Sequence, residues 1–171
     1  MGVTTALFTN DTNTIGEMSC NPAIGGLGKG HLVREIDALD GVMGDIADKS
    51  GIQFRLLNRS RGPAVQGLRT QSDRSIYKKE MQQKLLNYCN LSIFSMSINQ
   101  FIIENNEIKG LKAVDGTEIK CSKVILTTGT FLNGLIHIGD KRTPAGRYDE
   151  KPTLGLSDQL RKYDFKLGRL K

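Results

Sequence analysis

The sequence has few of the features that mark secreted, membrane or zinc-binding proteins. Its three cysteines lie at positions 20, 89 and 121 and form no C-x-x-C pair. An odd number without that spacing argues against a disulfide framework or a zinc site and fits a reducing compartment. No apolar run reaches the length of a membrane span, and no cationic, apolar leader opens the chain. We therefore expect a cytoplasmic protein with no metal site and no membrane contact.

Standard nucleotide-binding motifs are also missing from the glycine-rich stretch at residues 19–31. A Walker A loop requires a Ser or Thr after its lysine, and none follows Lys29. The spacing of Gly26, Gly28 and Gly30 is not that of G-x-G-x-x-G. The stretch nevertheless leads directly into a helical pattern, and a helix N-terminus attracts anions. Glycine also lets the backbone approach a ligand closely. Two interpretations stay open, an anion-binding turn and a strand-to-helix turn that serves packing alone.

The composition is that of a globular domain with a basic balance. The 171 residues are 38% hydrophobic and 25% charged, which is enough for one domain with a core. The net charge is +6, from 24 Lys and Arg against 18 Asp and Glu. Such a balance permits an anionic partner such as RNA without establishing one.

Apolar periodicity and turn residues predict an alternation of strands and helices. Residues 124–131 in particular read as a buried parallel strand that ends at a ligand crevice, the alternative being a core strand followed by an ordinary turn. The other expected strands are at 4–9, 52–57, 91–98 and 165–170. Helices are expected at 30–41 and 157–163, and a further helix is expected to end at about residue 88. An antiparallel meander is expected at 99–121 and a loop at 140–153.

Arginines cluster on a polar stretch at residues 58–74. Clustered Arg among Asn, Ser and Gln suits bidentate binding of phosphate or carboxylate. The alternative is a solvated helix start with an Arg69–Asp73 pair at i,i+4. We favour anion binding for Arg61 and Arg69 and a solvated surface for Arg59.

Three segments together resemble the MnmG (GidA) family, whose members are flavoproteins that modify the wobble uridine of certain tRNAs. The segments are residues 19–39, residues 126–139, and Gly62-Pro63-Ala64-Val65 with Arg69, Gln71, Asp73 and Arg74. The likeness runs from about residue 5 to residue 171. It implies an α/β fold, a three-layer FAD/NAD(P)-binding Rossmann-like sheet that lacks its first βα unit, with a small antiparallel β insertion. The whole chain, 1–171, would be a partial FAD-binding domain and an internal fragment of the family's N-terminal half.

The resemblance also implies a reaction and its participants. The family installs an aminomethyl-type group at C5 of uridine 34, using FAD, NADH and methylenetetrahydrofolate as the one-carbon donor. It works with an MnmE-type GTPase and is expected to form a homodimer. The NADH site would lie mostly outside this chain, and the chain by itself would be incomplete as an enzyme.

Residue roles follow from the same resemblance. Cys20 takes the position of a functional cysteine and is the expected nucleophile or acid/base. The expected cofactor-binding residues are Asn21, Gly25, Gly26, Gly28, Ile98, Thr128, Gly129 and Thr153. The expected anion contacts, to folate or tRNA phosphate, are Lys29, Arg61, Arg69 and Arg74. The competing hypothesis is a truncated, non-catalytic module that binds RNA or a protein partner, supported by the net charge and the arginines.

Overall fold

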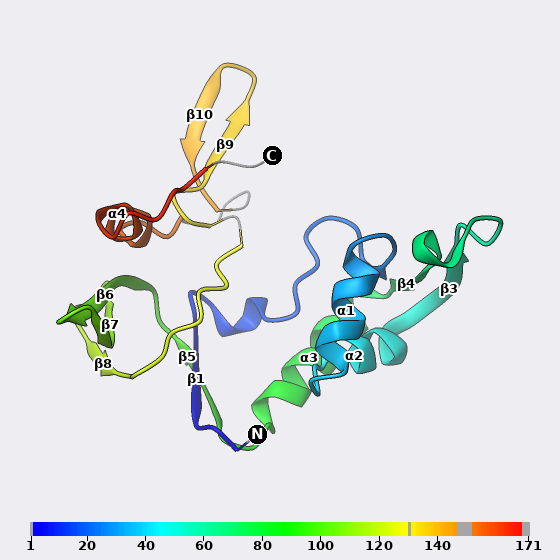
Figure 1. Ribbon diagram of the computed structural model, residues 1–171, viewed down its shortest axis with the longest axis horizontal. Coiled ribbons are helices and arrows are strands. Elements are labelled where there is room, and N and C mark those ends of the chain that lie inside the picture. Colours follow the sequence, from blue (N-terminus) through cyan, green and yellow to red (C-terminus); the bar gives the residue numbers. More distant parts are fainter. Residues whose placement is uncertain (1, 130, 147–151, 169–171) are drawn as a thin grey trace. The chain divides into compact units, whose positions relative to one another are not determined.

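The computed structural model describes residues 2–129, 131–146 and 152–168 (Figure 1). The chain divides into two compact units, Met1–Leu7 with Asp11–Phe94 and Phe8–Asn10 with Ser95–Lys171. Both contain helices and strands, so the expected α/β class is confirmed. Among the described residues, no helix is both long and apolar enough to cross a membrane.

The elements up to residue 95 include one three-stranded sheet, which lies in the first unit. The chain order is β1 (Thr5–Thr9), η1 (Thr12–Thr14), β2 (Ala23–Gly25), α1 (Lys29–Asp37), α2 (Met43–Ser50), β3 (Gly51–Leu57), η2 (Pro63–Val65), β4 (Gly67–Ser72), α3 (Arg74–Leu86) and β5 (Leu91–Ser95). Strand β4 lies at the centre, antiparallel to both β2 and β3. The expected helix at 30–41 and strand at 52–57 are therefore confirmed, the helix ending a few residues early.

One face of this sheet carries the core. Ile24 and Phe54 both pair with Thr70, so the three side chains share a face, because residues directly opposite in a sheet point the same way. Ile24 is buried with residues of α2 and α3, namely Ile46, Ala47, Tyr77 and Met81. The opposite face therefore carries the alternate residues of each strand, which include Arg55 and Arg69.

Strands β1 and β5 form a separate pair. The amide of Thr5 donates to the carbonyl of Asn90 over 2.9 Å, and the amide of Met96 donates to the carbonyl of Thr9 over 2.8 Å. The residue numbers of both strands increase from the first of these bonds to the second, so the two strands are parallel. Its strands correspond to the two predicted at 4–9 and 91–98.

The second unit contains the predicted meander. Its elements are β6 (Ile98–Glu104), β7 (Glu107–Ala113), β8 (Glu118–Lys120), β9 (Leu135–Ile138), β10 (Lys141–Pro144) and α4 (Leu156–Lys162). Strands β6, β7 and β8 pair in sequence order and antiparallel. Helix α4 packs on β6, where the Gln159 side chain accepts from the Phe101 amide at 2.6 Å and donates to the Phe101 carbonyl at 3.2 Å. The expected helix at 157–163 is confirmed.

The arginine-rich stretch is where the prediction first fails. Residues 67–72 form strand β4, not a loop or a helix start. The Arg69–Asp73 pair at helical spacing is therefore wrong, because Asp73 instead caps α3 by accepting from the Ile76 amide at 2.9 Å. The alternation of Leu68 and Thr70 with Arg69 and Gln71 is strand-like, but one face of it is polar throughout.

Residues 124–129 form no strand, contrary to the prediction. Ile125 is 87% exposed. A parallel strand buried on both faces needs hydrogen-bonding neighbours and two covering layers. Among the described residues, none of the sheets includes this segment.

Two smaller expectations in the second unit also need correction. Part of the expected loop at 140–153 forms strand β10, which pairs with β9 across the two-residue turn Gly139-Asp140. Gly139 has a φ of +58°, as such hairpin turns require. Residues 147–151 of that loop lie outside the described residues. Residues 165–168 form no strand, and residues 169–170 of that expected strand are also outside the described part.

Candidate functional site

The glycine-rich turn joins β2 to α1 and lies against β4. Gly25 has a φ of +106°, and a Cβ atom there would lie 2.1 Å from the Leu68 carbonyl oxygen. The next amide, that of Gly26, donates to the same oxygen over 2.7 Å. Glycine at position 25 thus allows two strands to approach closely, which is the packing interpretation of the turn.

Gly28 differs from Gly25 because its surroundings are open. It has a φ of +74°, and nothing lies within 4 Å of the position a Cβ would take. It caps α1 without a side-chain hydrogen bond. A ligand can approach the backbone here as glycine permits.

Lys29, the first residue of α1, is turned toward the protein's own backbone. Its ammonium donates to the Ala23 carbonyl over 3.1 Å. Burial lowers the pKa of this ammonium from its ordinary value. Lys29 therefore links the N-terminus of α1 to β2.

Cys20 is exposed and precedes β2. The Arg74 guanidinium donates to the Cys20 carbonyl. Two residues further on, the Pro22 carbonyl accepts from the Ser72 amide at 2.7 Å. The segment that carries the thiol is thus fixed to the start of α3.

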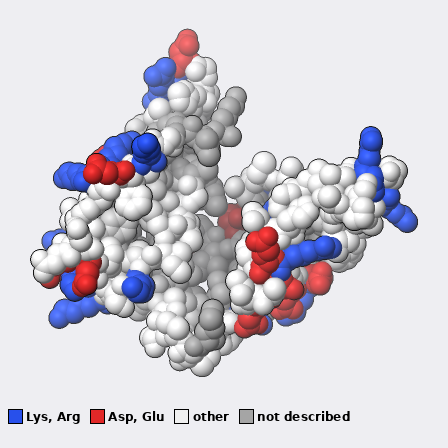
Figure 2. Space-filling view, viewed as in Figure 1, with Lys and Arg blue, Asp and Glu red and all other residues white. Residues whose placement is uncertain are grey.

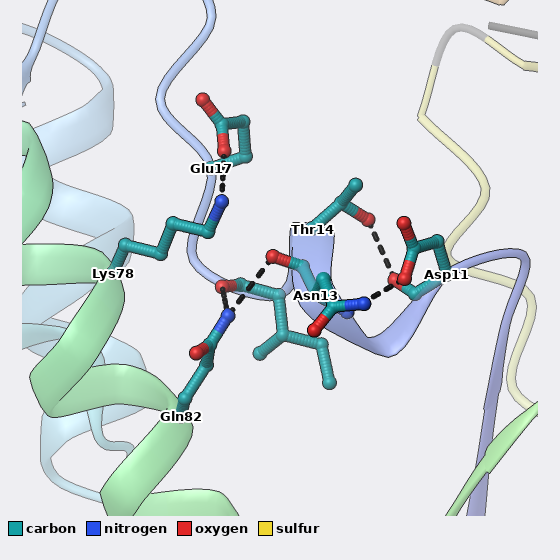
Figure 3. A network of polar contacts seen from close by, with 7 residues as sticks. Asp11, Asn13, Thr14, Glu17, Lys78 and Gln82 are labelled. Carbon is teal, nitrogen blue, oxygen red and sulfur yellow. Dashed lines mark hydrogen bonds and ion pairs between the residues drawn. The ribbon is translucent and has the colours of Figure 1, made fainter.

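Two further side chains of α3, those of Lys78 and Gln82, extend this attachment (Figure 3). Arg74, Lys78 and Gln82 are four residues apart, so they share one face of the helix. Lys78 pairs with Glu17 at 2.8 Å. Gln82 donates to the main-chain carbonyls of Asn13 at 3.0 Å and Ile15 at 3.2 Å. We call Arg74, Lys78 and Gln82 the α3 row; it holds the chain from residue 13 to residue 20.

Close backbone packing supports the same attachment. A Cβ at Gly16 would lie 3.0 Å from the Met81 Cβ and 3.1 Å from the Lys78 Cα, and Gly16 has a φ of +80°. Before it, Asp11 caps the short helix η1 by accepting from the Asn13 amide at 2.8 Å. The chain before Cys20 is therefore held at several points between Asp11 and Glu17.

A cavity of about 430 Å³ lies between the sheet and helices α1 and α2. Its lining includes Gly25, Gly30 and Thr70. The charged side chains around it are of both signs: Arg34 and His31 line it together with Asp37, Asp45 and Asp48. Asp45 is paired with Lys49 at 3.1 Å and with Lys84 at 3.7 Å.

Arg61 and Arg69 lie on the hairpin formed by β3 and β4. Arg69 is at the centre of β4, directly opposite Arg55 of β3 and Gly25 of β2. Arg61 is exposed in the connecting loop, and its carbonyl accepts from the Gln66 amide group at 2.9 Å. Among the described residues, no carboxylate pairs with either guanidinium.

The second unit brings three of the predicted cofactor-binding residues together around Phe131. The Phe131 amide donates to the Thr128 carbonyl at 3.2 Å, and its carbonyl accepts from the Thr153 amide at 2.8 Å. Gly129, between them, has a φ of +57° and open space around it. Thr153 itself is buried.

Ile98, the fourth predicted residue of this unit, begins β6. Its neighbour Asn99 has a buried side-chain oxygen with no hydrogen-bond partner among the described residues. A Cβ at Gly155 would lie 2.7 Å from the Asn99 carbonyl. The start of β6 therefore lies against the loop that contains Thr153 and offers an unsatisfied polar atom.

Metal ligands are not part of this arrangement. Over residues 2–129, 131–146 and 152–168, no group of three or more His, Cys, Asp and Glu is placed to hold a metal ion.

Comparison with known proteins decides the family. The family model for Glucose inhibited division protein A matches residues 1–171. The chain belongs to the GidA family. It is similar to the tRNA uridine 5-carboxymethylaminomethyl modification enzyme MnmG of Granulibacter bethesdensis, with 51% identity over 99% of the chain and 28% of that relative.

Solved structures agree with this assignment. The form II crystal structure of Aquifex aeolicus GidA matches with a TM-score of 0.90 and 48% identity, over 96% of this chain and 27% of that one. The GidA-related protein from Thermus thermophilus matches with a TM-score of 0.60 at 17% identity, over 96% and 60% of the two chains, which shows the fold alone. The chain thus spans little more than a quarter of the length of the MnmG and GidA proteins of Granulibacter bethesdensis and Aquifex aeolicus.

Sequence reasoning missed three residues of this GidA chain that the site uses. Lys78 and Gln82 hold the segment before Cys20, and Arg55 stands opposite Arg69. The spacing of Arg74, Lys78 and Gln82 was visible in the sequence. Their partners, more than fifty positions away, were not.

Proposed function

We propose that this chain is part of a flavoenzyme that modifies C5 of the wobble uridine of tRNA. The observation that carries the proposal is the 51% identity to an MnmG enzyme over 99% of the chain. A full enzyme of this kind would use NADH and methylenetetrahydrofolate, act with an MnmE-type GTPase, and form a homodimer.

Features of each unit, taken separately, support the binding of FAD. In the first unit, Gly28 has open space beside its backbone. Asn21 precedes the same turn in the sequence. In the second, Gly129 is open in the same way, and the Asn99 oxygen beside Ile98 lacks a partner among the described residues. The remaining proposed contacts are Gly25, Gly26, Thr128 and Thr153. FAD bound here would supply electron transfer to the one-carbon unit.

Cys20 is the proposed nucleophile toward uridine. C5 of uracil reacts poorly with electrophiles until a nucleophile adds at C6, and a thiolate is suited to that addition. A bond forms between Sγ and C6, the C5–C6 π electrons move toward O4, and C5 becomes nucleophilic. The exposure of Cys20 and its fixed backbone support this role.

The experiment replaces Cys20 by Ser in a full-length GidA protein that contains this segment. We expect loss of uridine modification by about 1,000-fold or more, with tRNA binding retained, because only the covalent step is removed. Cys89→Ser is the matched control, since Cys89 is also exposed and is distant in sequence from the turn. Full activity in Cys20→Ser would contradict the role of the thiol.

A further inference from the structure

The β3–β4 hairpin carries positive charge with no compensating acid. Residues 51–72 contain four arginines, at positions 55, 59, 61 and 69, and no Asp, Glu or Lys. The net charge of the chain is +6, so this segment accounts for most of it. In Figure 2 the part of the surface where Figure 1 draws the β3–β4 loop shows blue side chains and no red ones.

Two of these arginines stand directly opposite each other. Arg55 pairs with Arg69 in the register of β3 and β4, which places their Cβ atoms about 5 Å apart. Like charges in that position are destabilising. Among the described residues, neither guanidinium has an ion-pair partner.

The surroundings leave this pair accessible. It lies on the sheet face opposite Ile24 and the core. Gly25 stands beside Arg69 on the other edge and has no side chain to cover it. Gln53 and Gln71 form the next pair on the same face and add amide donors.

The arginines are spread along the hairpin and do not converge on one point. Arg55 and Arg69 lie midway along the strands, whereas Arg59 and Arg61 lie in the loop at residues 58–66. A single small anion can meet only part of such a row. A chain of phosphates can meet all of it, since Lys and Arg that follow a nucleic acid backbone neutralise successive phosphates.

We propose that this hairpin face binds the sugar-phosphate backbone of RNA, with Arg55 and Arg69 as its centre. The inference rests on the proposed tRNA substrate and specifies where that substrate is held. It also divides the four predicted anion contacts. Lys29 and Arg74 bond the protein's own carbonyls, so the hairpin arginines remain for the ligand.

The test measures binding of an unmodified tRNA transcript to the full protein between 50 and 200 mM salt. We expect Arg55→Gln/Arg69→Gln to weaken binding at least tenfold at the lower salt and to reduce the slope of log K against log salt by about 2. Arg34→Gln, on the exposed side of α1 in the same unit, is the control and should change binding less than twofold. Arg55→Lys/Arg69→Lys should keep most of the slope, because a lysine still neutralises a phosphate.

Each outcome separates this proposal from the proposed function. If the wild-type protein binds tRNA and the double Gln variant, shown to be folded by circular dichroism, binds it equally well, the hairpin proposal is overturned and the tRNA function stands. If the wild-type protein binds no tRNA, both are overturned. Competition by millimolar pyrophosphate with a slope of only 1 would overturn the extended backbone site in favour of a single anion.

Discussion

The Leu68 carbonyl oxygen occupies the space that a side chain at Gly25 would need, 2.1 Å from the position of its Cβ. Gly25→Ala must therefore separate β2 from β4 and also adopt a φ of +106°. We expect a loss of at least about 2 kcal/mol in the free energy of unfolding. Gly62→Ala, with a φ of −65° and open space, should change it by less than about 0.5 kcal/mol. Equal denaturation midpoints for the two variants would contradict the contact.

Arg74→Gln should loosen the segment that carries Cys20. Loss of the hydrogen bond to the Cys20 carbonyl is expected to cost about 1 kcal/mol locally, which speeds amide exchange at Ala23 and Ser72 roughly fivefold. Lys79→Gln is the control on the same helix, because Lys79 is exposed and lies off the α3 row. Unchanged exchange in Arg74→Gln would show that the bond does not hold the loop.

Asp73 begins α3 by accepting from the Ile76 amide. Asp73→Ala should destabilise the protein by about 1 kcal/mol, whereas Asp73→Asn keeps an oxygen acceptor and should cost much less. Urea denaturation of the two variants measures the difference. Similar losses in both would mean that the carboxylate charge, and not the cap bond, matters.

Because of Tyr77, the free energy of unfolding should depend on pH in the alkaline range. Burial raises the pKa of its phenol above the unfolded value of about 10. The folded state therefore favours the neutral form, and this stabilisation is present below pH ~10 and lost as the pH rises through the folded pKa. Tyr77→Phe should keep the wild-type Tm near pH 7 and exceed it above pH ~10. Parallel Tm curves between pH 8 and 11 would contradict the assignment.

Local signals were sufficient for much of the fold. The meander was predicted because Asn105-Asn106 and Asp115-Gly116 end its strands, and these turns need no distant partner. The Gly139-Asp140 turn carries the same kind of signal, and it closes the β9–β10 hairpin within the predicted loop.

Tertiary context decided the elements that were wrong. Strand β4 is polar on one face, and its strand character comes from pairing with both β2 and β3. Residues 124–129 have the composition of a buried strand but no pairing strand in the described part of the chain. The composition of a segment indicates whether its side chains can be buried, but it does not show whether a neighbouring strand is there to pair with it.

The site was predicted only in its local parts. Cys20 and the glycines were recognised from a contiguous stretch. The contact between Arg74 and Cys20 joins residues 54 positions apart, and that between Arg55 and Arg69 depends on strand register. Neither is visible without the fold.

Titration of the purified full chain with FAD tests the central claim most directly. Flavin fluorescence should saturate, and the Tm should rise with FAD concentration, because a ligand that binds only the folded state stabilises it. FMN, which lacks the adenosine monophosphate part of FAD, should bind more weakly, because it offers fewer contacts to the proposed cofactor-binding residues. A folded chain that binds no FAD would contradict the assignment of a flavin site to these residues.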